Sequence, residues 1–395
     1  MTDKVFTPIE FGDWPGRIVF GRGAVATLGA VVARVGGNRA LVLCGSTVAR
    51  TDMLGKVKAG LGDRLAAVFA EVKAHTPVEM VERGLVMFRE SGADALVTVG
   101  GGSAIDAGKA IQIRLATGGD LKPYAIRYAP GGAMEKPPLP KRTIPHVAVP
   151  TTAGSASDVM PTAAARDPHS RSKLLFWDDD LTPSATVLDP EMAVYAPAAL
   201  TAATGMTAMA RAVETLYSAY RHPISTGLGL HAIRLLREAL PRAVTTPNDL
   251  DARAACQMAC TMSGMAAINA MVSVVHAIGH IVGGRYGLQH GISHSILLPP
   301  TMRRLLPAIG GDQSLLLDAL GGSRTNSPER DGAECADRIA AFVGGLPLPQ
   351  RLRDVGVTEG ELGEIAHLTM SDYMMANLPR PMAETEVLAL LRSVW

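Results

Sequence analysis

The segment Ala95-Leu-Val-Thr-Val99, which runs directly into Gly100-Gly-Gly-Ser103 and then Asp106, decides the fold class of this chain. A short apolar run between polar turns is typical of a buried parallel strand. The glycines let a ligand approach the backbone, and the free amides at the start of the next helix attract an anion. Ser103 and Asp106 also match a capping box. We therefore expect a phosphate-binding strand–loop–helix unit, with an ordinary tight turn as the alternative.

Apolar runs on both sides of this segment read as further buried strands: Arg17–Phe20, Ala40–Cys44, Val68–Ala70, His146–Val149 and Ala185–Leu188. Helical patterns such as Ala24–Val35 and Val78–Glu90 separate them, and residues 117–142 read as an irregular surface insertion. Strands that alternate with helices predict a parallel sheet covered by helices. The expected fold is therefore an α/β N-terminal dinucleotide-binding domain with a parallel sheet, over residues 1–195.

A second loop follows the strand His146–Val149 and is rich in glycine and hydroxyl side chains: Pro150, Thr151, Thr152, Gly154, Ser155 and Ser157. Ligands of open parallel sheets bind beyond the carboxyl ends of the strands. Both loops should therefore face one crevice.

The second half of the chain has a different pattern. After Pro197 the strand signals stop, and the apolar spacing predicts helices at Ala202–Tyr220, Gly227–Leu240, Leu250–Val275, Glu329–Phe342 and Met382–Ser393. This change predicts a domain boundary near residues 190–197 and an all-α C-terminal helical domain over residues 196–395.

Four histidines gather in this second half, at His276, His280, His290 and His294. His276 and His280 are four residues apart, so they share one face of a helix. Together with a third histidine after a loop, they could converge on a divalent metal ion or on a reacting substrate. The alternative for some of them is a core or capping role.

Composition excludes several classes of protein. The net charge of +1 over 395 residues argues against a nucleic-acid partner, whose phosphates need a basic face. No apolar stretch is long enough for a membrane span, and the first residues lack a signal-peptide pattern. The chain has only four cysteines, which fit packing residues of a reduced protein. We expect a cytoplasmic enzyme.

The order of these motifs resembles the iron-containing (type III) alcohol dehydrogenase superfamily. The two loops, the strand end at Asp189-Pro190, the segment from Gly205 to Glu214 and the histidine segment all match, from about Phe20 to Arg304. The resemblance implies hydride transfer by a nicotinamide cofactor, NADPH or NADH, held between the two domains. It assigns the cofactor to Ser46, Gly101, Gly102, Ser103, Asp106, Thr151, Thr152, Ser155 and Lys173.

The resemblance also implies where a metal would lie, and this chain departs from the pattern there. Metal-dependent members use an Asp and a His that correspond to Thr207 and Arg211. A guanidinium has no lone pair for a metal, and at ~4 Å it would repel a divalent ion by ~8 kcal/mol at an effective dielectric near 20. No metal is expected; if one is present, its ligands are His276, His280 and His290.

Arginine suits a carboxylate, so Arg211 and Thr207 are predicted to bind an acidic small-molecule substrate, with a salt bridge from Arg211 to Glu214 as the alternative. The maleylacetate reductase branch is similar in having a histidine at the position of His294. These features predict a metal-independent NAD(P)H-dependent reductase of a carboxylate-bearing carbonyl or enone such as a maleylacetate-like compound. His280 or His276 would supply the proton, and His290 or His294 would polarise the acceptor oxygen.

Two other functions are weighed against this prediction. One is a metal-dependent alcohol dehydrogenase using iron or zinc, and the other is a non-redox enzyme or binding protein that retains the fold. The family also implies a homodimer, in which the strand Arg17–Phe20 could pair between subunits.

Overall fold

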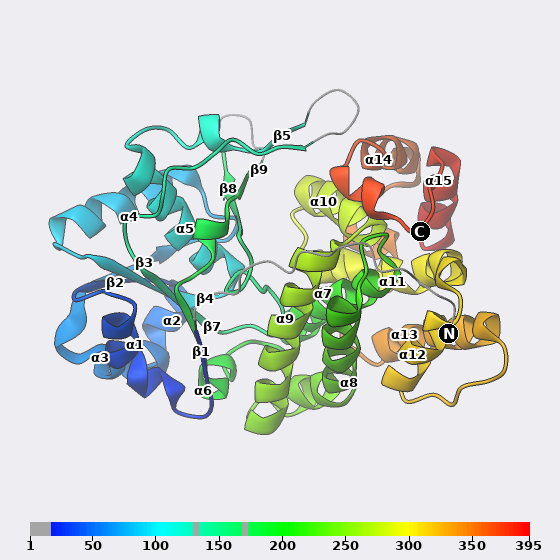
Figure 1. Cartoon of the computed structure of the whole chain (residues 1–395), viewed down its shortest axis with the longest axis horizontal. Helices are drawn as coiled ribbons and strands as arrows, with labels where there is room; N and C mark the ends of the chain where they lie inside the picture. Colours follow the sequence, from blue (N-terminus) through cyan, green and yellow to red (C-terminus); the bar gives the residue numbers. More distant parts are fainter. Residues whose placement is uncertain (1–16, 129–133, 168–172) are drawn as a thin grey trace.

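The computed structural model of the chain describes residues 17–128, 134–167 and 173–395 (Figure 1). Two sequence-based statements fall partly on other residues. The segment without a signal-peptide pattern belongs to residues 1–16, and residues 129–133 are part of the insertion; both lie outside the described residues.

Six parallel strands form one sheet in the order β1-β10-β7-β4-β2-β3. Their bounds are Ile18–Phe20 (β1), Ala40–Gly45 (β2), Leu65–Val72 (β3), Ala95–Gly100 (β4), His146–Pro150 (β7) and Ala185–Leu188 (β10). Every residue of the central strands β4 and β7 is buried, as expected for a sheet with both faces covered. The predicted parallel α/β architecture is confirmed.

Helices cover both faces of this sheet (Figure 1). They are Leu28–Arg34 (α1), Ser46–Arg50 (α2), Asp52–Leu61 (α3), Val78–Glu90 (α4), Gly102–Thr117 (α5) and Pro190–Ala193 (α6). Apolar side chains of α1 and α3 pack on one face, and those of α4 and α5 pack on the other. The predicted helix Ala24–Val35 begins as a 3-10 turn over Ala24–Thr27, so its regular part is shorter than expected.

Two short antiparallel ribbons were missed by the sequence analysis. Arg127–Tyr128 (β5) pairs with Met134–Glu135 (β6), so the insertion is less irregular than predicted. Thr162–Arg166 (β8) pairs with Lys173–Trp177 (β9), and this second ribbon packs against α5.

The rest of the chain is helical in the described residues, as predicted (Figure 1). The helices are Ala198–Tyr217 (α7), Pro223–Thr245 (α8), Leu250–Ala270 (α9), Val274–Tyr286 (α10), His290–Leu305 (α11), Asp312–Ala319 (α12), Pro328–Gly344 (α13), Leu362–Thr369 (α14) and Glu384–Ser393 (α15). Together they bury the largest apolar cluster of the protein. α7 lies at the centre of this cluster, where it packs against α8, α9 and α11.

The prediction of one helix over Leu250–Val275 is wrong. The chain breaks after α9, where Met271 has a φ of +61°, and α10 starts in a new direction at an angle of 108°. The carboxylate of Glu214 accepts hydrogen bonds from the amides of Ser273 and Val275, which stabilises the new helix start. No single helix of the described residues is long and apolar enough to cross a membrane; α9 and α10 meet that test only as this bent pair.

Candidate active site

A cavity of about 920 Å³ lies where the carboxyl ends of the strands face the helical half. The loops after β2, β3, β4 and β7 line it on one side, and α7, α10 and the start of α11 line it on the other. Because both predicted loops contribute to its wall, the expectation that they face one crevice is confirmed.

The glycine loop packs tightly against the second loop. A Cβ atom added to Gly101 would lie 3.2 Å from Thr152 Cγ2, and one added to Gly102 would lie 3.3 Å from Ser155 Cβ. Within the described residues, the buried hydroxyl oxygens of Thr152 and Ser155 have no hydrogen-bond partner, although both residues line the cavity. Unpaired hydroxyls beside a glycine loop fit a ligand that brings phosphate oxygens to this wall.

The predicted capping box of Ser103 and Asp106 is wrong, because α5 begins at Gly102 and neither side chain caps it. Ser103 Oγ accepts a hydrogen bond from the His75 amide at 3.1 Å. Asp106 accepts one from Ser157 Oγ at 2.7 Å and one from the Ala164 amide at 3.3 Å. Burial raises the pKa of Asp106, and the charge of Lys109 opposes that shift. Asp106 therefore joins α5 to the second loop and to β8 at the cavity wall.

The structure brings together all but one of the predicted cofactor residues. Those that line the cavity are Gly101, Gly102, Ser103, Asp106, Thr151, Thr152, Ser155 and Lys173. Ser46 does not line the cavity, and its neighbours Gly45 and Thr47 do. The predicted strand end therefore reaches the cavity wall, but the face of the first turn of α2 was not predictable from spacing in so short a helix.

The four histidines form a chain of rings at the other end of the cavity. Ring centroids of His276 and His294 are 4.1 Å apart, those of His294 and His290 are 5.8 Å apart, and those of His290 and His280 are 5.9 Å apart. His276, His280 and His290 line the cavity, whereas His294 is fully buried and does not. Of the two rings predicted to polarise the acceptor oxygen, His290 therefore lines the cavity and His294 does not.

Burial lowers the pKa of His276, His290 and His294 well below the usual 6.5. The nearby charge of Arg211 adds to this effect for His276 and His294. These rings are therefore neutral near pH 7, and a neutral imidazole can accept a proton at one ring nitrogen and donate a hydrogen bond from the N–H of the other.

Two carboxylates that sequence reasoning did not assign to the site hold the histidines in place. Glu214 on α7 is fully buried and bonds to Nδ1 of His276, while Ser273 Oγ donates to the same carboxylate at 2.9 Å. Asp372, next to the C-terminal helices, accepts from Nδ1 of His280 at 2.9 Å. Each bond leaves Nε2 as the free ring nitrogen. Burial raises the pKa of Glu214 to about 7, against the hydrogen bonds that lower it.

Arg211 lines the cavity at a buried position and is only 5% exposed. Its guanidinium donates to the carbonyl oxygens of Gly154 at 3.1 Å and Ser155 at 3.2 Å, and to Ser263 Oγ at 3.2 Å. The alternative of a salt bridge to Glu214 is wrong, because Glu214 is engaged with His276 and the start of α10. Arg211 thus ties α7 to the second cofactor loop. Thr207, one turn earlier, lines the cavity and donates to Ala203 O at 3.3 Å.

Comparison with known proteins identifies this arrangement. Residues 15–190 match the family model of iron-containing alcohol dehydrogenases, and residues 201–395 match the model of the C-terminal part of that family. The chain belongs to the iron-containing alcohol dehydrogenase family. It is therefore a nicotinamide-dependent oxidoreductase, which confirms the predicted enzyme class.

Relatives in this family cover nearly the whole chain. A 1,3-propanediol dehydrogenase from Klebsiella pneumoniae is 34% identical over 391 residues, which are 95% of this chain and 96% of that protein. A maleylacetate reductase from Rhizobium sp. (strain MTP-10005) is 29% identical over 385 residues, 98% of this chain and 97% of that protein. The crystal structure of a 1,3-propanediol oxidoreductase superposes with a TM-score of 0.91 at 31% identity, covering 98% of this chain and 100% of that one.

The family name implies iron, which needs several donor atoms directed at one point. The described residues contain no group of three or more His, Cys, Asp or Glu side chains placed to hold a metal ion. At the positions where the resemblance places an Asp and a His, this chain has Thr207 and Arg211, and a guanidinium has no lone pair for a metal. The buried cation of Arg211 also lies close enough to lower the pKa of His276. Arg211 therefore supplies no ligand where the iron of this fold would need one.

Proposed function

We propose that this enzyme uses NADH or NADPH, without a metal, to reduce a small carbonyl or enone compound that carries a carboxylate. The observation that supports this function most is the buried guanidinium of Arg211, which lines the substrate end of the cavity beside the histidines. A buried cation repels a metal ion and attracts an acid.

The charges of the cavity wall support an anionic ligand. Three cationic side chains line it, those of Lys73, Lys173 and Arg211, and Asp106 is the one carboxylate among the described lining residues. Lys173 and the glycine loop account for the cofactor phosphates and ribose. Arg211 is left for the substrate, because it lines the cavity and, within the described residues, donates its hydrogen bonds only to uncharged groups, those of Gly154, Ser155, Ser263 and Cys260.

The bound nicotinamide supplies a hydride to the carbonyl or enone carbon. His280 is the best-placed residue to deliver the balancing proton, since it lines the cavity, is partly exposed and is oriented by Asp372. His290 lies beside it and polarises the acceptor oxygen through a hydrogen bond. His276, held by Glu214 at Nδ1, presents Nε2 to the cavity as a hydrogen-bond acceptor. We assign His294 to the support of His276 and His290, because it lies behind the cavity wall.

Metal content and substrate preference together test this function. The purified enzyme should contain far less than one iron or zinc per chain, and its activity with a short keto acid should survive a chelator. It should prefer that keto acid to the aldehyde of equal length without the carboxylate. One bound metal per chain with loss of activity in chelator would support a metal-dependent alcohol dehydrogenase instead. Failure to bind either nicotinamide cofactor would support a non-redox role.

We also propose a homodimer built on β1. This strand is at the edge of the sheet, pairs with β10 alone among the described strands, and leaves Phe20 47% exposed. Sedimentation of the wild type and of Phe20→Lys tests it: the wild type should sediment as a dimer, and a monomeric wild type would contradict the proposal.

A further inference from the structure

The end of the cavity formed by β2 and β3 carries a cation with no acidic counterpart. Gly45, at the end of β2, pairs with Val72, at the end of β3, so the residues that follow the two strands emerge side by side. Gly45, Thr47 and Lys73 all line the cavity there. Thr47 and Lys73 are exposed, so a ligand can reach both side chains.

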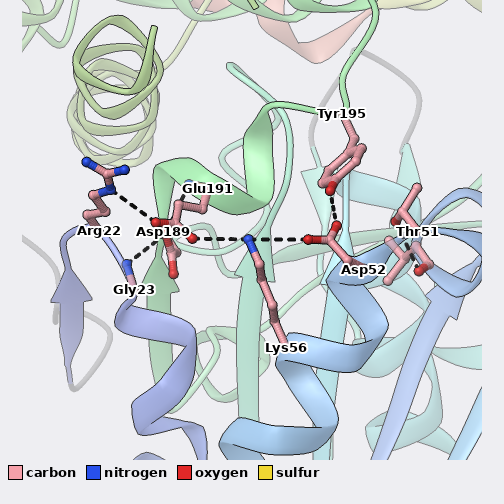
Figure 2. Close-up of polar contacts among 9 residues, drawn as sticks. Arg22, Gly23, Thr51, Asp52, Lys56, Asp189, Glu191 and Tyr195 are labelled. Atoms are coloured by element: carbon pink, nitrogen blue, oxygen red, sulfur yellow. Dashed lines mark hydrogen bonds and ion pairs between the residues drawn. The ribbon is translucent and has the colours of Figure 1, made fainter. Parts of the chain in front are cut away.

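Lys73 differs in its surroundings from Lys56 on α3. Figure 2 shows Lys56 between Asp52 and Glu191, with Tyr195 pointing at the same Asp52. The two carboxylates thereby balance the positive charge of Lys56, and Asp52 is bonded to both Lys56 and Tyr195. Within the described part of the chain, Lys73 forms no ion pair.

The position of this edge relative to the glycine loop indicates which part of a dinucleotide reaches it. The glycine loop follows β4, the neighbour of β2, whereas the histidines line the cavity from the helical half, on α10 and α11. With the pyrophosphate on the loop and the nicotinamide toward the histidines, the adenosine ribose extends to the ends of β2 and β3. In dinucleotide-binding folds an acidic side chain at such a strand end binds the ribose hydroxyls, whereas a cation accommodates a 2′-phosphate.

We propose that Lys73, with the hydroxyl of Thr47, forms a 2′-phosphate subsite and that the enzyme prefers NADPH to NADH. The lining carboxylate, Asp106, belongs to α5 and is already bonded to Ser157 and Ala164, so no acid faces this subsite among the described lining residues. This inference rests on the use of a nicotinamide cofactor and goes beyond it by choosing between the two forms.

Binding titrations of the intact enzyme test the subsite without turnover. NADPH, NADH, 2′,5′-ADP and 5′-AMP are each titrated against the wild type, Lys73→Ala and Lys58→Ala. Lys58, exposed on α3 and outside the cavity wall, is the matched control for loss of one positive charge. The wild type should bind NADPH about tenfold more tightly than NADH, with the same order for 2′,5′-ADP over 5′-AMP. Lys73→Ala should remove most of that difference and leave the Kd for NADH within about twofold, as charge-assisted contacts with the phosphate are lost.

A second variant adds charge instead of removing it. Thr47→Glu places a carboxylate at the same exposed position, and it should weaken NADPH more than tenfold while NADH is still bound. Equal affinity of the wild type for the two cofactors, or an equal loss of both in Lys73→Ala, would overturn the subsite while leaving the nicotinamide function intact. If neither cofactor binds the wild type, both the subsite and the proposed function are wrong.

Discussion

The carboxylate of Glu214 bonds to Nδ1 of His276 and, with its other oxygen, receives the amides at the start of α10. One buried side chain therefore sets both the direction of the helix and the orientation of the ring that it carries into the cavity. Because the bond occupies Nδ1, the ring can meet a ligand only through Nε2.

Glu214→Gln tests this orientation. The glutamine oxygen can still accept from Ser273 and Val275, but its amide group cannot accept from His276, so the ring should lose its fixed tautomer. We expect kcat to fall ~100-fold with little change in the KM for substrate. Steady-state kinetics measures both, and thermal unfolding checks that the variant is folded. A folded variant with the kcat of the wild type would show that the ring needs no such partner.

Arg211→Gln separates the two roles of the guanidinium. Its loss should lower kcat/KM for a keto acid by ~100-fold, or ~2.7 kcal/mol, since a charge-assisted contact with the substrate disappears. For an uncharged aldehyde, Arg211→Gln affects kcat/KM only by displacing the loop at Gly154 and Ser155. Its kcat/KM should therefore fall less than about tenfold. Equal losses for both substrates would mean that Arg211 serves the loop alone.

His294→Leu should change how stability depends on pH. The folded-state pKa of His294 lies well below 6.5. Below about pH 6.5 the unfolded chain therefore binds a proton at His294, whereas the folded chain does not. In the wild type, the neutral ring of His294 therefore makes its full contribution to the free energy of unfolding above about pH 6.5, and this contribution is lost as the pH falls. Between pH 7.5 and 5.5 the variant should gain ~1.4 kcal/mol relative to the wild type in chemical denaturation. An identical pH dependence of the two proteins would refute a buried neutral His294.

Thr152→Val and Ser155→Ala remove the two buried hydroxyls that lack a partner in the described protein. Neither change should destabilise the fold, because no hydrogen bond is broken within the protein. Each should weaken cofactor binding, by roughly 1 kcal/mol or about fivefold, if the hydroxyl binds the pyrophosphate. Fluorescence titration measures the affinity. Unchanged affinity in both variants would remove these side chains from the cofactor site.

Local patterns in the sequence were sufficient to predict the sheet, and the glycine loop and three of the four histidines that they singled out line one cavity. The strand at Ala95–Val99 is buried on both faces, as its continuous apolar run predicts. His276 and His280 share a helix face at a spacing of four, and both reach the cavity.

Contacts between distant parts of the chain could not be predicted in this way. The break between α9 and α10 depends on Glu214, 59 residues before Ser273, and the partner of His280 is Asp372, 92 residues further along. No local spacing signals either pair. The face of α2 that turns Thr47 toward the cavity and Ser46 away from it likewise depends on how the helix packs.

A crystal structure of the enzyme with a nicotinamide cofactor and a short keto acid tests the central claim most directly, because it shows the acid, the guanidinium and any metal at once. We predict the substrate carboxylate at ~3 Å from the guanidinium of Arg211, with no metal between His276, His280 and His290. Density for iron or zinc coordinated by those three histidines, with the substrate carboxylate away from Arg211, would contradict the account.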